Sequence, residues 1–100
     1  MGFVKVAEVD QVAAGSSRAV WVAGRELALF NVDGEFYCIE NSCPHNDGPL
    51  SEGYLQEDVV MCPWHAWQFN VRTGCMLYNE SICVATYLCK VVDGEVLVEA

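Results

Sequence analysis

The chain has few positive charges: five lysine and arginine residues stand against fourteen aspartate and glutamate residues, giving a formal net charge of -9. Nucleic-acid binding requires clustered basic side chains that neutralise phosphates, and five scattered ones cannot form such a cluster. An anionic membrane surface would repel the chain for the same reason. The composition therefore predicts no nucleic-acid partner and no membrane partner.

Long apolar runs are also missing, since no stretch approaches the roughly 18 consecutive apolar residues that a membrane-spanning helix requires. Residues 1–6 contain neither the apolar segment nor the cleavage site of a secretory signal peptide. We therefore expect a soluble protein in the cytoplasm. Because disulfides are rare there, the six cysteines are interpreted as metal ligands or buried thiols rather than as a disulfide framework.

Helical periodicity is a third absence. No segment keeps a 3.6-residue apolar period over ten positions, although residues 8–15 could form one helical turn. With 100 residues and no repeat, linker or low-complexity tract, the chain is predicted to form a single domain, 1–100, and a monomer. A chain of this length buries only roughly 60–65% of the surface it exposes when unfolded, so a bound metal would help it fold.

Strand signals account for most of the remaining sequence. Asp33-Gly34 and Asp93-Gly94 each lie between two apolar runs, and Asp-Gly pairs tolerate the positive φ angles of a tight hairpin. Residues 72–74 predict a further turn. The pattern predicts an all-β fold, a small antiparallel sandwich or barrel with two loops extended around 43–53 and 62–67. The expected strands are 3–9, 19–23, 27–32, 36–39, 59–61, 84–91 and 96–98.

Both histidines of the chain lie beside cysteines, in the motifs C-P-H at 43–45 and C-P-W-H at 62–65. The proline after each cysteine discourages regular structure, so two short loops each present one sulfur and one nitrogen ligand. This pattern predicts a four-ligand metal site. Zinc would bind all four ligands at one tetrahedral ion, whereas a Rieske-type [2Fe-2S] centre would have both cysteines on one iron and both histidines on the other. The four candidate ligands are Cys43, His45, Cys62 and His65.

The sequence around these ligands resembles the Rieske ferredoxins, such as the ferredoxin components of bacterial aromatic ring-hydroxylating dioxygenase systems. The family loops have the patterns C-P-H-x-x-x-x-L-x-x-G and C-P-x-H-x-x-x-F, followed by a T-G turn, and the chain matches them over 43–53, 62–69 and 71–74. The resemblance implies one Rieske-type [2Fe-2S] cluster, bound by these four ligands at one tip of the β-sandwich. It also implies a one-electron carrier between an NAD(P)H-dependent flavoprotein reductase and a terminal oxygenase, with no catalysis of its own.

Departures from the respiratory Rieske proteins predict a low reduction potential. Those proteins carry a disulfide across the site, at positions that are Gly48 and Trp64 in this chain. They also carry a serine and a tyrosine whose hydroxyls bond cluster sulfurs, where this chain has Trp67 and Phe69. Hydrogen bonds to sulfur stabilise the reduced state, so their loss predicts a potential near the low end of the Rieske range, about -150 mV.

Two further departures concern the loops themselves. Ala66 stands where the family commonly has glycine, and the proline often found in the third loop is missing from 75–82. The shape of that third loop is therefore not predicted. Trp64 and Trp67 are interpreted as side chains that pack the second ligand loop and shield the site. Gly48 and Gly53 are interpreted as positions that serve backbone geometry, through a close approach to the cluster or a turn.

The cysteines outside the motifs have no neighbouring histidine and no C-x-x-C spacing, and we interpret them as buried thiols that act as small apolar side chains. A redox-sensing role for Cys75 is the alternative. These residues are Cys38, Cys75, Cys83 and Cys89.

Five acidic side chains lie near the motifs in sequence. They are interpreted either as a solvated face or as a docking surface for basic patches on redox partners, which would act mainly on encounter rate and orientation. They are Glu40, Asp47, Glu52, Glu57 and Asp58.

Other functions remain open at this point. A terminal oxygenase subunit would need a second iron site with two more histidines and a carboxylate, but both histidines are already used. A small Rieske-type subunit of an assimilatory nitrite reductase is the main alternative. A zinc-stabilised binding module without redox function is the other.

Overall fold

A computed structural model shows the fold and describes residues 2–44, 48–64 and 66–99. Within these ranges the regular elements are strands and two short 3-10 turns, η1 (Val9–Gln11) and η2 (Leu50–Glu52), without an α-helix. No helix among the described residues could cross a membrane. The strands are β1 (Phe3–Glu8), β2 (Ser17–Val22), β3 (Arg25–Val32), β4 (Glu35–Glu40), β5 (Tyr54–Gln56), β6 (Val59–Met61), β7 (Gln68–Asn70), β8 (Thr86–Tyr87), β9 (Cys89–Val92) and β10 (Glu95–Glu99).

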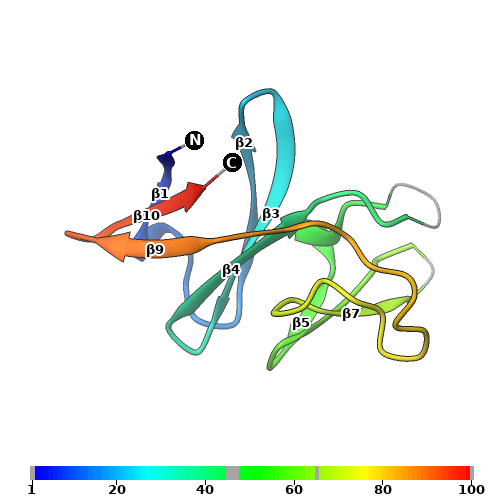
Figure 1. Ribbon diagram of the computed structural model, residues 1–100. Helices are drawn as coiled ribbons and strands as arrows, with labels where there is room; N and C mark the ends of the chain where they lie inside the picture. The colour runs from blue at the N-terminus through cyan, green and yellow to red at the C-terminus, as the bar shows by residue number, and fades with distance from the viewer. Residues whose placement is uncertain (1, 45–47, 65, 100) are drawn as a thin grey trace.

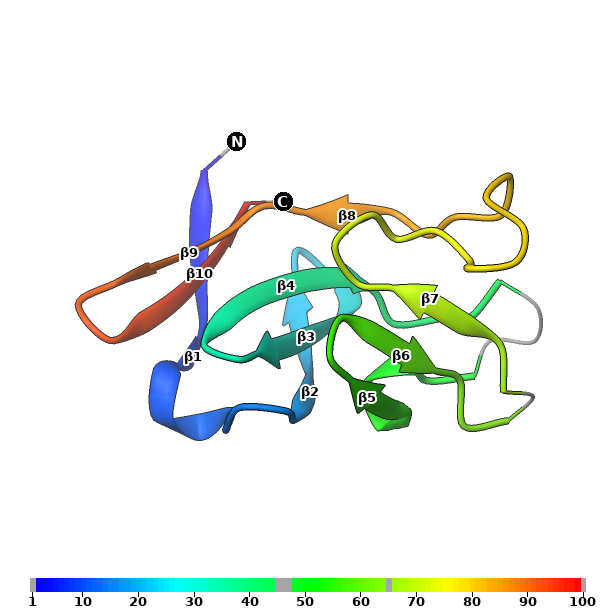
Figure 2. The same cartoon turned by 90° about the horizontal axis from the view of Figure 1, so that it is seen from below.

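The strands form three antiparallel sheets, in the orders β1-β10-β9, β2-β3-β4-β8 and β5-β6-β7. The two ends of the chain lie close together, beside the paired strands β1 and β10 (Figure 1). Figure 2 shows β5, β6 and β7 at one end of the molecule and the hairpin of β9 and β10 at the opposite end. The all-β antiparallel fold predicted from the sequence is confirmed.

Both Asp-Gly pairs form the tight hairpins predicted for them. Asp33 and Gly34 connect β3 to β4 with φ angles of 53° and 95°, and Asp93 and Gly94 connect β9 to β10 with φ angles of 51° and 78°. Two consecutive positive φ angles are typical of the type I′ turn, whose twist matches that of the paired strands. A third hairpin, at 23–24 between β2 and β3, lacks an Asp-Gly pair and was not predicted from the sequence.

Some predicted elements differ from the observed ones. The run 84–91 forms two strands instead of one, because β8 pairs with β4 whereas β9 pairs with β10 in another sheet. The strands β5 and β7 were missed, since each has three residues and includes polar ones. The helical turn expected within 8–15 is the 3-10 turn η1, where the Glu8 amide donates a hydrogen bond to Gln11 Oε1 at 2.9 Å.

Strand β3 contributes to both halves of the hydrophobic core. Successive residues of a strand point to opposite faces, and on β3 both faces are buried, with Leu27 and Ala28 at most 1% exposed. Burial on both faces explains why the sequence is continuously apolar at this strand instead of alternating. The half that also contains the candidate cysteine ligands is called the loop-side core below. Its members are Ala28, Phe30, Val32, Ile39, Cys43, Leu50, Val60, Cys62, Phe69, Val71 and Val84.

The other cysteines are arranged differently from what the sequence predicted. Cys75 and Cys83 form a disulfide with a Cα–Cα distance of 4.0 Å, so their interpretation as buried thiols is wrong. Cys38 is a buried thiol as predicted, and the half-buried Cys89 packs against the same core cluster. A hydrogen bond with Cys89, and then burial, raise the pKa of the Cys38 thiol above its ordinary value.

Candidate metal centre

The two predicted sulfur ligands lie in one cluster of buried side chains. Cys62 directly follows β6, and Cys43 lies in the loop that follows β4. Their side chains are 1% and 0% exposed, and both belong to the loop-side core with Val60 and Phe69. The structure thus brings together two thiols that are far apart in sequence. The other two candidate ligands, His45 and His65, lie outside the described residues.

Asn41 closes the base of the first ligand loop. It is 3% exposed, and its Oδ1 accepts a hydrogen bond from the Ser51 amide at 2.7 Å while its backbone oxygen accepts one from the Leu50 amide at 2.6 Å. Inside this closure, the Cys43 amide donates to the Gly48 oxygen at 2.9 Å. Sequence reasoning missed Asn41, although a polar residue between a strand and a ligand loop is the type that caps backbone groups.

The second ligand loop turns tightly around Cys62. The Cys62 amide donates to the Trp67 oxygen at 2.7 Å, and its backbone oxygen accepts from the Ala66 amide at 3.0 Å. Ala66 has a φ angle of 61°, in the left-handed region. A residue with a Cβ costs roughly 1–2 kcal/mol there, which explains why glycine is favoured at this position. The second ligand loop therefore holds Ala66 in a backbone conformation that is unfavourable for alanine.

Gly53 lies where the two ligand-bearing segments approach each other. It precedes β5, which pairs with β6, and a Cβ added at Gly53 would lie 2.2 Å from the Met61 backbone oxygen. Its φ angle of -76° is ordinary, so the requirement for glycine comes from close packing and not from backbone strain. This supports the interpretation that Gly53 serves backbone geometry, since it lets the start of β5 pack against the end of β6, directly before Cys62.

A hairpin from 75 to 83 forms the third loop and lies along β7. The Leu77 amide donates to the Gln68 oxygen at 3.0 Å, and the Met76 amide donates to the Ile82 oxygen at 2.9 Å. The side chains of Met76 and Ile82 pack against the loop-side core. The loop that lacks the family's proline is thus an ordered, disulfide-closed hairpin that covers the core of the two cysteines.

The two tryptophans of the second loop have different environments. Trp67 packs against the loop-side core, with its ring centroid 6.5 Å from that of the buried Phe69. Trp64 is 59% exposed and is not part of that core. The packing role predicted for both residues is confirmed for Trp67, whereas Trp64 is mostly exposed, and the predicted shielding of the cluster stays a prediction for both.

Arg72 connects the turn after β7 to the main sheet. Its guanidinium lies 4.9 Å from the centre of the Tyr37 ring and donates to the Tyr37 hydroxyl at 2.5 Å. Its Nε also donates to Asp58 Oδ2 at 3.2 Å. Burial, and then the hydrogen bond to Glu35, raise the pKa of Tyr37, while Arg72 opposes the shift. The network holds the end of β7 against β4.

The described members of the acidic set, Glu40, Glu52, Glu57 and Asp58, differ in their local contacts. Glu40 accepts a hydrogen bond from the Ala85 amide at 2.6 Å, and Asp58 is paired with Arg72, so both have local structural partners. Glu52 and Glu57 are exposed, and Asp47 lies outside the described residues. A docking surface for redox partners and a solvated face therefore both stay predictions for the acidic residues.

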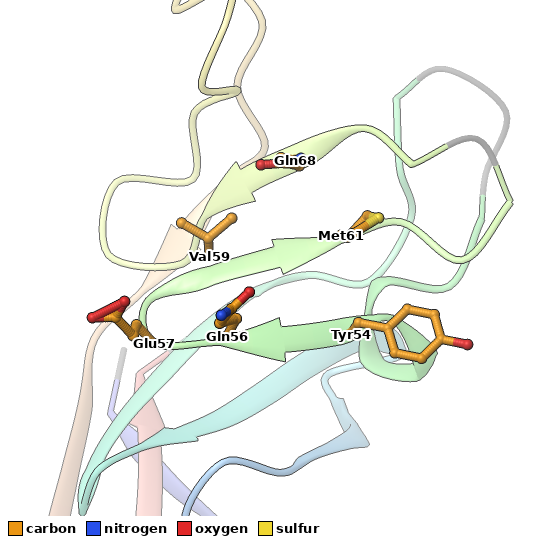
Figure 3. A pocket seen from close by; sticks show the side chains of 6 residues that line it. All are labelled: Tyr54, Gln56, Glu57, Val59, Met61 and Gln68. Atoms are coloured by element: carbon orange, nitrogen blue, oxygen red, sulfur yellow. The ribbon is translucent and has the colours of Figure 1, made fainter.

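A shallow pocket lies on the sheet that leads to the second ligand loop. Figure 3 shows side chains of β5, β6 and β7 around it, including Tyr54 and Met61 at the end nearer the loops. Tyr54 is 73% exposed, and among the described residues that line the pocket Glu57 alone is charged. Since Met61 immediately precedes Cys62, this face continues into the ligand loop.

The donor set fits an iron–sulfur cluster. Cys43 and Cys62 would supply two thiolate ligands from within the apolar core, and soft thiolates suit Fe–S clusters as well as zinc. The described residues contain no group of three or more His, Cys, Asp or Glu side chains that could hold a metal, and both histidines of the motifs lie outside these ranges.

Residues 2–88 match the family model of the Rieske [2Fe-2S] domain. The chain belongs to the Rieske family. Its cofactor is accordingly a Rieske [2Fe-2S] cluster, and the zinc alternative is set aside.

Similar proteins extend this assignment to the Rieske ferredoxins. The chain is 32% identical over 100 residues to the ferredoxin component of the naphthalene 1,2-dioxygenase system of Pseudomonas putida, which covers 97% of this chain and 94% of that protein. It is 45% identical over 75 residues to the biphenyl dioxygenase ferredoxin subunit of Pseudomonas sp. strain KKS102, covering 74% of this chain and 69% of that subunit. The predicted Rieske ferredoxin, an electron-transfer component of oxygenase systems, is confirmed.

Solved structures of Rieske ferredoxins have the same fold as this chain. The ferredoxin in the complex of reduced oxygenase and oxidized ferredoxin in carbazole 1,9a-dioxygenase has a TM-score of 0.88 and 35% identity, covering 96% of this chain and 91% of that chain. The putative small subunit of a nitrite reductase has a TM-score of 0.87 at 24% identity, with full coverage of both chains. At that identity the likeness shows the fold alone, so the nitrite reductase alternative gains no functional support.

Proposed function

We propose that this Rieske ferredoxin carries single electrons from an NAD(P)H-dependent flavoprotein reductase to the terminal oxygenase of an aromatic-ring dioxygenase system. The proposed cluster ligands are Cys43, His45, Cys62 and His65. The observation that carries the proposal is the burial of Cys43 and Cys62 in one core cluster, on loops with the Rieske spacing. Electron transfer to a terminal oxygenase is supported by the relatives, which are ferredoxin subunits of dioxygenases.

The protein contributes position and environment to this function. When bound, the cluster supplies a one-electron couple, with reduction favoured at the iron held by neutral imidazoles. Cys43 and Cys62 would bind from the interior, where the loop-side core excludes water. Asn41 and the turn at Ala66 hold the two loops in place. Little reorganisation is then needed when an electron arrives or leaves.

The potential is proposed to be low. Phe69 is fully buried in the loop-side core and Trp67 packs against that core, and neither side chain carries a hydroxyl. Hydrogen bonds to cluster sulfurs raise the potential, so we expect a midpoint near the low end of the Rieske range, about -150 mV. Such a potential suits a carrier that receives electrons from a flavoprotein.

Partner contact is proposed at the end of the molecule that bears the ligand loops. Trp64, two residues after Cys62, is exposed, and Tyr54 is exposed at the end of the sheet nearer the loops (Figure 3). Aromatic side chains are enriched in protein interfaces. The exposed Glu52 and Glu57 add negative charge near the same sheet, which favours partners with basic surfaces. We propose that the protein acts as a single-domain monomer in the cytoplasm.

An EPR-monitored redox titration of the purified protein tests the proposal. We expect the low average g-value of a histidine-ligated [2Fe-2S] cluster, appearing on reduction at a midpoint near or below about -100 mV. A Rieske signal at a strongly positive midpoint would reject the oxygenase-ferredoxin function. A colourless, zinc-containing protein without a signal would reject electron transfer altogether.

The histidine ligands are tested separately, by His45→Cys and His65→Cys. Replacing a neutral ligand by a thiolate should shift the midpoint sharply negative in any variant that retains a cluster. An unchanged midpoint in a loaded variant would show that the substituted histidine does not bind iron.

A further inference from the structure

The Cys75–Cys83 disulfide closes the third-loop hairpin at its open end. The two residues face each other across an isolated antiparallel bridge. Inside this closure, hydrogen bonds run from the Met76 amide to the Ile82 oxygen and from the Ile82 amide to the Asn79 oxygen, at 2.9 and 3.0 Å. Cys83 is exposed and Cys75 is half-buried, so the disulfide lies at the surface of the molecule.

The hairpin has one packed side and one open side. Met76 and Ile82 pack against the loop-side core, which contains Cys43 and Cys62. On the open side, Tyr78 is 79% exposed and Leu77 is 39% exposed. A surface hairpin with one open side gains local stability from its covalent closure in addition to its packed side.

We propose that the Cys75–Cys83 disulfide is a second redox site of the protein, which undergoes thiol–disulfide exchange with a protein dithiol of the Cys-x-x-Cys class. A thiolate of the dithiol attacks the sulfur of Cys83, the more exposed residue of the pair, forms a mixed disulfide and releases Cys75 as a thiolate, which takes up a proton. The second thiol of the partner then resolves the mixed disulfide and releases Cys83. Two electrons and two protons pass to the protein, and the partner becomes a disulfide; the reverse exchange restores the bond.

Thiol–disulfide exchange at this site changes the stability of the hairpin that packs against the loop-side core. Opening the disulfide removes the constraint on the segment from 75 to 83, where the cysteines are 8 positions apart. Loop-closure entropy for a segment of this length corresponds to an upper limit of roughly 80-fold in the equilibrium between open and closed hairpin. The reduced hairpin therefore opens more often beside Cys43 and Cys62, and a cluster bound there is lost more readily. Only this last consequence rests on the proposed function.

The test uses the intact protein, purified without reductant and then treated with reduced thioredoxin. Alkylation and mass spectrometry identify the thiols that appear. Hydrogen exchange measures how often the hairpin opens, through the Met76 and Leu77 amides, which are hydrogen-bonded in the closed hairpin. We expect new thiols at Cys75 and Cys83, and exchange of these two amides accelerated by up to roughly 80-fold. Loss of cluster absorbance to a chelator should accelerate in the same direction.

Two variants serve as controls. In the double variant Cys75→Ser/Cys83→Ser, hydrogen exchange of the Met76 and Leu77 amides should be fast before any treatment and should not change on addition of thioredoxin. In Cys89→Ser, which lies outside the hairpin, thioredoxin should accelerate this hydrogen exchange as it does in the unmodified chain. If the double variant does not fold, the thioredoxin-reduced chain supplies the same comparison. The proposal would be overturned if Cys75 and Cys83 were alkylated before any reduction. It would also be overturned if the Met76 and Leu77 amides exchanged hydrogen at equal rates with and without the disulfide. The alkylation and hydrogen-exchange readouts do not need a cluster, unlike the chelator readout, so a failure of the EPR test above leaves these two decisive.

Discussion

Replacing Gly74 by alanine should destabilise the protein much more than the same replacement at Gly94. Both glycines have a φ angle of 78°, so a Cβ in the left-handed region costs about 1–2 kcal/mol at either position. At Gly94, in the β9–β10 hairpin, a Cβ would have no heavy atom within 4 Å. That backbone cost should therefore be the whole effect of Gly94→Ala.

At Gly74 the added methyl group has no room. Its Cβ would lie 2.4 Å from the Val84 oxygen and 2.8 Å from Thr86 Cγ2. The segments must move apart, which strains the hydrogen bond from the Val84 amide to the Gly74 oxygen at 2.8 Å. Overpacking costs about 1–3 kcal/mol and a lost hydrogen bond about 0.5–1.5 kcal/mol, so Gly74→Ala should cost about 2–4 kcal/mol more than Gly94→Ala.

Thermal unfolding of the two variants with matched iron content measures the difference. For a domain of this size, 1 kcal/mol corresponds to roughly 4–8 °C in Tm, so the two Tm values should differ by at least about 8 °C. Equal losses in Tm would refute the reasoning, because they would show that the left-handed backbone alone requires glycine at position 74.

Three other outcomes are expected. Asn41→Ala should lower the free energy of unfolding by about 1–3 kcal/mol and reduce iron content, because the buried Ser51 amide loses its acceptor, whereas Asn41→Asp should lose less. Phe69→Tyr should raise the EPR-determined midpoint on the order of 50 mV if its hydroxyl reaches a cluster sulfur. Stability in urea should fall as the pH rises above 9.0, because the raised pKa of Cys38 keeps a proton on the folded chain that the unfolded chain releases; Cys38→Ala should reduce this slope.

Each of these has a clear opposing result. Unchanged stability and iron content in Asn41→Ala would show that the first ligand loop does not depend on this residue. An unchanged or lower midpoint in a Phe69→Tyr variant that retains its cluster would show that the missing hydroxyl at position 69 is not the cause of the low potential. A urea midpoint that is flat across pH 9.0 would mean that Cys38 titrates alike in the folded and unfolded chains.

Turns that depend on an Asp-Gly pair were predicted correctly from the sequence. The Asp-Gly pairs specify hairpins because the requirement for positive φ is met by those two residues alone, whatever surrounds them. Polar three-residue strands such as β5 and β7 carry no comparable signal, since their pairing with β6 defines them. The split of 84–91 into β8 and β9 likewise depends on two different partner strands.

The sequence by itself determined the class of the protein and its candidate ligands. Two short motifs place cysteine and histidine side chains on their own loops, and that local chemistry needs no distant contact to be recognised. Only the tertiary structure decided which distant segments meet. The pairing of Cys75 with Cys83 depends on a hairpin folded along β7, and the need for glycine at 53 arises from the Met61 oxygen on a neighbouring strand. Such contacts join residues through the packing of whole sheets, and spacing along the chain does not encode them.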